Sequence, residues 1–144
     1  TSAEVSDVLQ VGKVVGSDTP AVDQQIELLN ASVKLAAGAE PINVSRASYT
    51  IEAGGNATTV SGNPSKNDGI THYRIQGFRN DDTSIVSDQQ DVMVVQFNLT
   101  NISGVEPLDE SEKVTLVTHA PAGGSNYKQL RAPRSIENGD SKIL

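Results

Sequence analysis

Four aspartates between residues 81 and 91 come nearest, by residue type, to a metal site. Asp81, Asp82, Asp88 and Asp91 fall within eleven residues, in the stretch NDDTSIVSDQQD. Hard cations such as Ca²⁺ bind carboxylate and carbonyl oxygens from flexible loops, which this stretch can supply. The spacing is not that of an EF-hand, whose loop has glycine at its sixth position. Two interpretations stay open: the four carboxylates bind calcium, or they form an acidic turn surrounded by water.

The remaining residues that could act in catalysis do not occur in a catalytic pattern. His72 and His119 are far apart and lack the HExxH spacing, so we interpret both as residues on the surface of strands. The sequence contains no G-x-S-x-G turn, no glycine-rich phosphate loop and no cysteine. We therefore expect a protein without catalysis, without a small-molecule substrate, and with no cofactor beyond the calcium considered above.

Asparagine sequons are more frequent than chance predicts. Five of the ten asparagines begin an N-x-[ST] sequon, whereas the serine and threonine content would give fewer than about two. The candidate glycosylation sites are Asn30, Asn43, Asn56, Asn98 and Asn101. This enrichment indicates a glycosylated, extracellular surface. Asn56 follows two glycines and is expected to be the most accessible acceptor, while Asn30 lies inside a predicted strand.

Charge and hydrophobicity argue against several classes of partner. The net charge is −7 and no basic cluster occurs, so neither nucleic acid nor an anionic membrane surface is an expected partner. No apolar run approaches the roughly 20 residues of a membrane-spanning helix. The chain has only three tyrosines and two phenylalanines, so its core has to consist mainly of aliphatic side chains.

Alternating apolar residues predict β-strands along most of the chain. Met93, Val95, Phe97 and Leu99 share one face of a segment, as in a half-buried antiparallel strand. Strands are predicted at residues 8–15, 26–35, 48–51, 70–78, 92–99, 114–118 and 127–132. The prediction is one domain over residues 1–144, with an all-β fold. We expect an antiparallel, immunoglobulin-like β-sandwich or barrel of about seven to ten strands.

Further details of this domain follow from the same patterns. The apolar residues shift from even-numbered to odd-numbered positions at Leu28–Leu29, which predicts a bulge there. The polar stretch 53–68 is expected to be a long exposed loop, and residues 1–10 fit the end of a helix. The predicted core consists of Leu28 or Leu29, Val33, Leu35, Ile51, Ile75, Phe78, Val95, Phe97, Val114, Leu116 and Leu130.

Four stretches, in order along the chain, carry a resemblance to one family. They are VSDVLQV (5–11), VKLAAGAEPINVS (33–45), VSDQQDVMVVQFNL (86–99) and VTLVTHAPAGGSNYKQLRAPRSI (114–136), the last followed by a closing KIL. This series is similar to the outer domain of archaellins, the subunits of the archaeal swimming filament. Gln90-Asp91 stands where the family has Gly-Asp.

The resemblance implies a structural subunit of the archaeal motility filament, the archaellum, located at the cell surface and without catalysis. Its partners would be identical or homologous filament subunits. Archaellins begin with an apolar helix that polymerises in the filament core and meets the membrane before assembly. The sequence starts at Thr1 without it, so we expect a soluble outer domain. The alternative is an immunoglobulin-like adhesin or pilus domain, or a stator-type binding module of the same apparatus.

Overall fold

Strands dominate the secondary structure. The structure is a computed structural model that describes residues 9–19, 24–77, 83–121 and 123–144. Besides one 3₁₀ turn, Val44–Arg46, these residues form β1 (Leu9–Ser17), β2 (Leu28–Leu35), β3 (Ile42–Asn43), β4 (Ser48–Ala53), β5 (Asn56–Ser61), β6 (Ile70–Gln76), β7 (Ile85–Val86), β8 (Val92–Asn98), β9 (Lys113–His119), β10 (Ser125–Arg131) and β11 (Ser141–Ile143). Each segment predicted to be a strand coincides with one of these strands, which confirms the all-β fold class.

The expected helix end at residues 1–10 is wrong where it can be checked. Leu9 and Gln10 belong to β1, and residues 1–8 lie outside the described residues. Within the described part of the chain, no helix is long and apolar enough to span a membrane.

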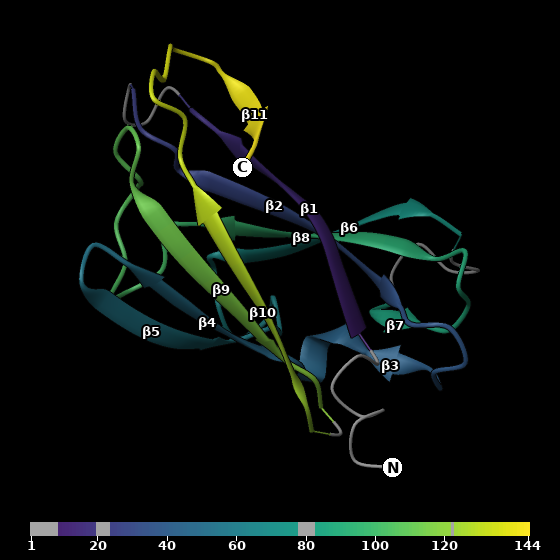
Figure 1. Ribbon diagram of the computed structural model, residues 1–144. Coiled ribbons are helices and arrows are strands. Elements are labelled where there is room, and N and C mark those ends of the chain that lie inside the picture. Colours follow the sequence, from purple (N-terminus) through teal and green to yellow (C-terminus); the bar gives the residue numbers. More distant parts are fainter. Residues whose placement is uncertain (1–8, 20–23, 78–82, 122) are drawn as a thin grey trace.

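The strands form two facing antiparallel sheets and a small third one (Figure 1). The larger sheet has the order β11-β1-β2-β8-β6, and the second has the order β10-β9-β4-β5. The short pair β3-β7 lies beside β6, where Nε of Arg74 donates to the Thr83 carbonyl oxygen at 2.5 Å. Because β5 and β6 end their sheets without a further strand in the described residues, the architecture is a sandwich and not a closed barrel.

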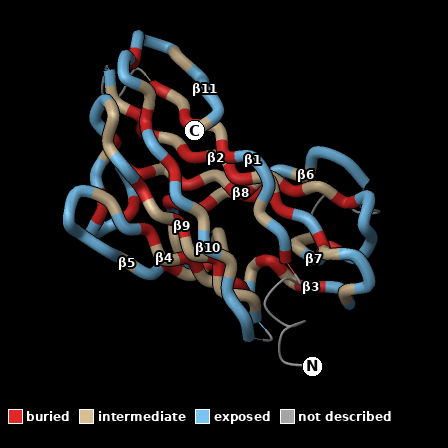
Figure 2. Tube along the Cα trace, viewed as in Figure 1, coloured by how far each residue is buried: buried red, intermediate tan, exposed pale blue. Residues whose placement is uncertain are grey.

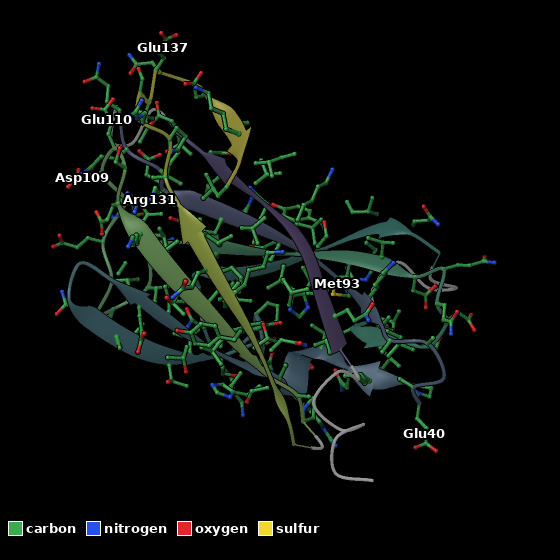
Figure 3. The ribbon with its side chains drawn as sticks, viewed as in Figure 1. Glu40, Met93, Asp109, Glu110, Arg131 and Glu137 are labelled. Atoms are coloured by element: carbon green, nitrogen blue, oxygen red, sulfur yellow. The ribbon has the colours of Figure 1, made fainter. Side chains whose placement is uncertain are left out.

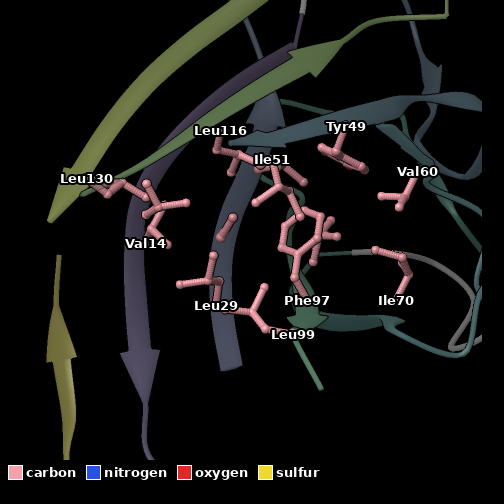
Figure 4. Packing of buried hydrophobic residues seen from close by; sticks show 14 of the residues in the cluster. Val14, Leu29, Tyr49, Ile51, Val60, Ile70, Phe97, Leu99, Leu116 and Leu130 are labelled. Atoms are coloured by element: carbon pink, nitrogen blue, oxygen red, sulfur yellow. The ribbon is translucent and has the colours of Figure 1, made fainter. Parts of the chain in front are cut away.

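The core lies between the two sheets because both bury alternate side chains. In β8, Met93, Val95 and Phe97 are buried while their neighbours are half-buried. In β9, Val114 and Leu116 alternate in the same way. Figure 2 shows this alternation along the facing strands, and Figure 4 shows the aliphatic side chains packed around Phe97. Aliphatic packing of this kind is what the low aromatic content required.

Most of the predicted core is confirmed. The predicted residues that are buried are Leu29, Val33, Leu35, Ile51, Val95, Phe97, Val114, Leu116 and Leu130. Ile75 is 62% exposed, so its prediction is wrong. The reason is a bulge between Arg74 and Gln76, where β6 leaves its register with β8 at the edge of the sheet. Phe78 lies outside the described residues.

The predicted long loop at residues 53–68 is partly wrong. Its first half is strand β5, which forms a hairpin with β4 in the register Ala53↔Asn56 to Ser48↔Ser61. Gly54 and Gly55 make the two-residue turn with φ values of 59° and 81°. Positive φ at both turn residues is typical of the turn type that matches strand twist, and glycine adopts it without steric cost.

The bulge predicted at Leu28–Leu29 is wrong. β2 keeps an unbroken register with β8 from Leu28 to Val33. The irregularity lies in β1, between Val11 and Val14. The alternation of apolar residues is interrupted near Leu28 for a different reason. Ile26 precedes β2, forms an isolated bridge with Leu108 outside the sheet, and is buried there.

Strand β1 is held on its outer edge in two different ways. Its second half pairs with β11, in the register Val15↔Ile143 to Ser17↔Ser141. Along its first half, side chains of β10 replace a neighbouring strand: Asn126 donates to the Leu9 carbonyl oxygen, and Lys128 Nζ donates to that of Gly12 at 2.6 Å. The two sheets are thereby joined along this edge.

Candidate functional sites on the surface of the sandwich

The acidic turn is organised around the buried carboxylate of Asp91. Its Oδ2 accepts hydrogen bonds from the backbone N–H of Ser87 at 3.0 Å and of Asp88 at 3.1 Å, and from Ser87 Oγ at 3.3 Å. Asp91 is 3% exposed, whereas Asp88 is exposed. The Asp91 carboxylate therefore shapes the turn that leads into β8.

The structure leaves the calcium prediction open. Asp81 and Asp82 lie outside the described residues. Among the residues that are described, no three carboxylate or histidine side chains converge as a metal ion would require. The sequence placed Asp88 and Asp91 together correctly, but it did not distinguish the exposed carboxylate from the buried one that caps a turn.

The sequon asparagines differ in whether their side-chain amides already form hydrogen bonds within the protein. Asn30 Nδ2 donates to the Val15 carbonyl oxygen at 3.3 Å, and its Oδ1 accepts from Gln96 Nε2 at 2.8 Å. Asn56 lies exposed at the start of β5, directly after the hairpin turn, and Asn101 is exposed after β8. Exposed amides are reachable by a modifying enzyme, while that of Asn30 is held by two neighbours.

Two other sequons fold back on themselves. Asn43 Oδ1 accepts from the backbone N–H and the hydroxyl of Ser45, at 3.1 and 2.6 Å. Asn98 Oδ1 accepts from Thr100 in the same way, at 3.1 and 2.6 Å. In both cases the sequon closes a local turn in which the hydroxyl residue contacts the acceptor asparagine.

The two histidines have different surroundings: the expected surface position is wrong for His72, which is buried, and fits His119. His72 is buried, with Nδ1 3.3 Å from Ser84 Oγ, and burial lowers its pKa below the usual 6.5. His119 lies on the outer face of the second sheet. Its Nε2 is 2.9 Å from Thr50 Oγ1, and its Nδ1 is 3.0 Å from Ser125 Oγ.

His119 is part of a row of hydrogen bonds that crosses all four strands of the second sheet. Thr50 Oγ1 continues the row to Thr59 Oγ1 at 2.9 Å, so β5, β4, β9 and β10 each contribute one side chain. The sequence could not reveal this row, because it depends on the cross-strand register Thr50↔Thr59 and Ser125↔His119. These groups pair with one another on a polar, solvent-facing surface.

Comparison with known proteins finds similarity to archaeal flagellins. No protein-family model matches the sequence. The fold matches archaeal flagellin FlaB1 of Methanocaldococcus jannaschii with a TM-score of 0.77, covering 94% of this chain and 95% of that one at 15% identity. In sequence, Flagellin B1 of Natrialba magadii is 28% identical over 151 residues, covering 98% of this chain and 73% of that protein. The chain is thus similar to archaeal flagellins in sequence and in fold.

Two further solved structures share the archaeal flagellin fold. One is the archaeal flagellum of Methanospirillum hungatei, with a TM-score of 0.67 and 17% identity over 96% of this chain and 72% of that one. The other is the archaellum periplasmic stator complex FlaF and FlaG of Sulfolobus acidocaldarius, with a TM-score of 0.51 and 12% identity, covering 85% and 88%. The resemblance to archaellins is thereby confirmed, and the stator fold is the more distant of these structures.

Proposed function

We propose that this chain forms the outer part of a structural subunit of the archaeal motility filament and lies outside the cell on the filament surface. The observation that carries this proposal is the sequence similarity to a flagellin over 98% of the chain. The match to a filament structure agrees with it, because that structure has the same sandwich. The proposed partners are identical or homologous filament subunits.

Catalysis is not part of this proposal. The relative in sequence is a flagellin, and both histidines of this chain have structural surroundings within the sandwich. His72 is buried against Ser84, and His119 is held between Thr50 and Ser125. A subunit repeated along a filament needs a stiff surface that is compatible with water. Hydrogen-bonded antiparallel sheets and a polar outer face supply both properties.

The alternative, a stator-type module, is supported by the fold alone and by the lower TM-score of 0.51. The two functions are separated by where the protein is found. Filaments sheared from the cells that make this protein should contain it in many copies along their length, detected by mass spectrometry and by antibody labelling in the electron microscope. A stator module would stay with the cell body. Deleting the gene should shorten or abolish the filaments.

A further inference from the structure

The larger sheet contains no aspartate or glutamate. Its five strands carry Lys13, Lys34, Arg74 and Lys142, although the whole chain has a net charge of −7. Among all the strands that the structure describes, Glu52 of β4 is the single carboxylate. Among the described residues, all the acidic ones except Glu52 thus lie outside the strands, and Lys142 of β11 pairs with Asp140 at 3.5 Å.

The outer face of this sheet combines its lysines with apolar side chains. Lys13, Lys34 and Val92 line one shallow groove. Tyr73 stands opposite Val94 on the neighbouring strands and is 45% exposed. We call these five residues the basic face. The second sheet is different, because its outer face carries the hydrogen-bonded row from Thr59 to Ser125. A surface that combines lysines with apolar side chains, and whose strands contain no carboxylates, is compatible with a protein contact.

Six of the eighteen acidic residues lie in two segments at one end of the sandwich, while Glu40 lies at the other end (Figure 3). Segments 105–112 and 133–140 contain six carboxylates and one basic residue, Arg134. We call the carboxylates the acidic end: Glu106, Asp109, Glu110, Glu112, Glu137 and Asp140. The backbone N–H of Ile136 donates to Glu110 Oε2 at 2.9 Å, and that of Ser111 donates to the Pro133 carbonyl oxygen at 2.9 Å, which joins the two segments. Figure 3 shows Asp109, Glu110 and Glu137 together at this end.

The two charged surfaces lie at opposite ends of the β1–β2 pair. Lys34 faces Gln10 near the start of β1. Beyond the end of β1, the backbone N–H of Asp18 donates to the Asp140 carbonyl oxygen at 2.8 Å. One copy therefore cannot bring its own acidic end onto its own basic face, but a second copy can.

We propose that the basic face of one copy binds the acidic end of the next copy. This inference rests on the proposed function as a filament subunit and names the surfaces by which the outer parts meet. Opposite charges across the contact favour the correct pairing and speed up association. Since the two surfaces differ, the contact is head-to-tail. Such contacts form a ring where the rotation between copies closes, and an open-ended helical filament where it does not.

Cysteine cross-linking in filaments tests the contact, because the chain has no native cysteine. One variant carries Lys34→Cys and Glu137→Cys together, and the control carries Glu52→Cys and Glu137→Cys. Lys34, Glu52 and Glu137 are all exposed, and Glu52 lies on the second sheet. Filaments from the source cells are treated with a short bis-maleimide and dissolved in detergent. The Lys34/Glu137 variant should give a ladder of covalent multimers, whereas the control should stay mostly monomeric.

Charge reversal provides a second readout. Lys34→Glu alone and Glu137→Lys alone should each reduce the number of filaments per cell, and the double variant should restore part of it. Equal melting temperatures of the purified variants show that the fold is intact. The contact would be contradicted if filaments contain the Lys34/Glu137 variant but give no ladder. It would also be contradicted if the control gives an equally strong ladder. Either result would leave the proposed function standing. Absence of the unmodified chain from filaments would overturn both.

Discussion

Tyr49 and Phe97 meet edge to face across the interior of the sandwich, with ring centroids 4.9 Å apart and ring planes at 82°. Tyr49 belongs to β4 of the second sheet and Phe97 to β8 of the larger one, and both are 0% exposed. The chain has only five aromatic side chains, and Tyr49 and Phe97 head the fully buried side chains of the described core by volume.

Truncation of Phe97 should therefore be costly. We expect Phe97→Ala to lower the free energy of unfolding by about 3–5 kcal/mol, because it leaves a cavity against Tyr49. Urea denaturation of the purified chain measures this. The matched control is Tyr127→Ala, since Tyr127 is 66% exposed and surface substitutions usually change stability by about 0.5 kcal/mol or less. Similar losses for both variants would contradict the assignment of Phe97 to the core.

Two glycines with the same backbone conformation should respond differently to alanine. Gly38 and Gly77 have φ values of 79° and 77°, so alanine costs about 1–2 kcal/mol at either position. A Cβ on Gly38 meets no atom within 4 Å, whereas on Gly77 it would lie 2.1 Å from Asp91 Oδ1. We expect Gly77→Ala to cost a further ~1–3 kcal/mol. Equal unfolding midpoints for the two variants would show that the Asp91 turn adapts freely.

Acid should destabilise the fold through His72. In the unfolded chain the imidazole titrates near 6.5, and burial lowers its pKa in the folded protein. Below pH 6.5 the unfolded state binds the proton first, so the free energy of unfolding falls as pH decreases, until the folded-state pKa is reached. Denaturation at several pH values should show a weaker dependence in His72→Gln than in the unmodified protein. An unchanged dependence would mean that other groups cause it.

Glycan occupancy should follow the freedom of the asparagine side chain. Asn56 is exposed beside the hairpin turn, while the Asn30 amide is bonded to Val15 and Gln96. A glycan on Asn30 would disrupt the bond that its amide donates. We expect mass spectrometry of native filaments to find glycan on Asn56 in more copies than on Asn30. The reverse order would contradict this accessibility argument, and protein from a bacterial host is not informative.

The calcium proposal for Asp81, Asp82, Asp88 and Asp91 makes a thermal prediction. A cation that binds only the folded state should stabilise it by about 2.7 kcal/mol at a hundredfold excess over its dissociation constant. The melting temperature should rise with added calcium, return with chelator, and become insensitive to calcium in Asp82→Asn. If the melting temperature does not change with calcium, the stretch is a solvated acidic turn.

The strands that the sequence predicted correctly are those that bury one face. Alternation in β8 and β9 reflects real burial, so period-two patterns located them and their core residues. β5 was missed because NATTVS contains one buried residue, Val60. It is an edge strand whose conformation depends on β4 and on the Gly54–Gly55 turn. Ile75 was misassigned for a related reason, since a bulge at a sheet edge changes which side chains face inward.

The basic face, the acidic end and the row through His119 could not be predicted from the sequence. The acidic residues at 106–112 and 137–140 are far from Lys34 in sequence, and only the topology shows that they occupy opposite ends of one strand pair. The row through His119 needed the exact register of four strands. In contrast, the resemblance to archaellins was visible in four ordered stretches, because turn residues and apolar runs keep their order even where identity is low.

The placement of β1 has a mechanical consequence. This strand pairs with β2 from Leu9↔Leu35 to Ser17↔Leu28, interrupted between Val11 and Val14, and along its second half it pairs with β11. A pull on the chain at Leu9, directed along the strand, would load these hydrogen bonds together in shear instead of opening them one after another. The β10 side chains on the Leu9 and Gly12 carbonyl oxygens add resistance at the same end. The sandwich is thus built to transmit tension arriving at Leu9 into both of its sheets.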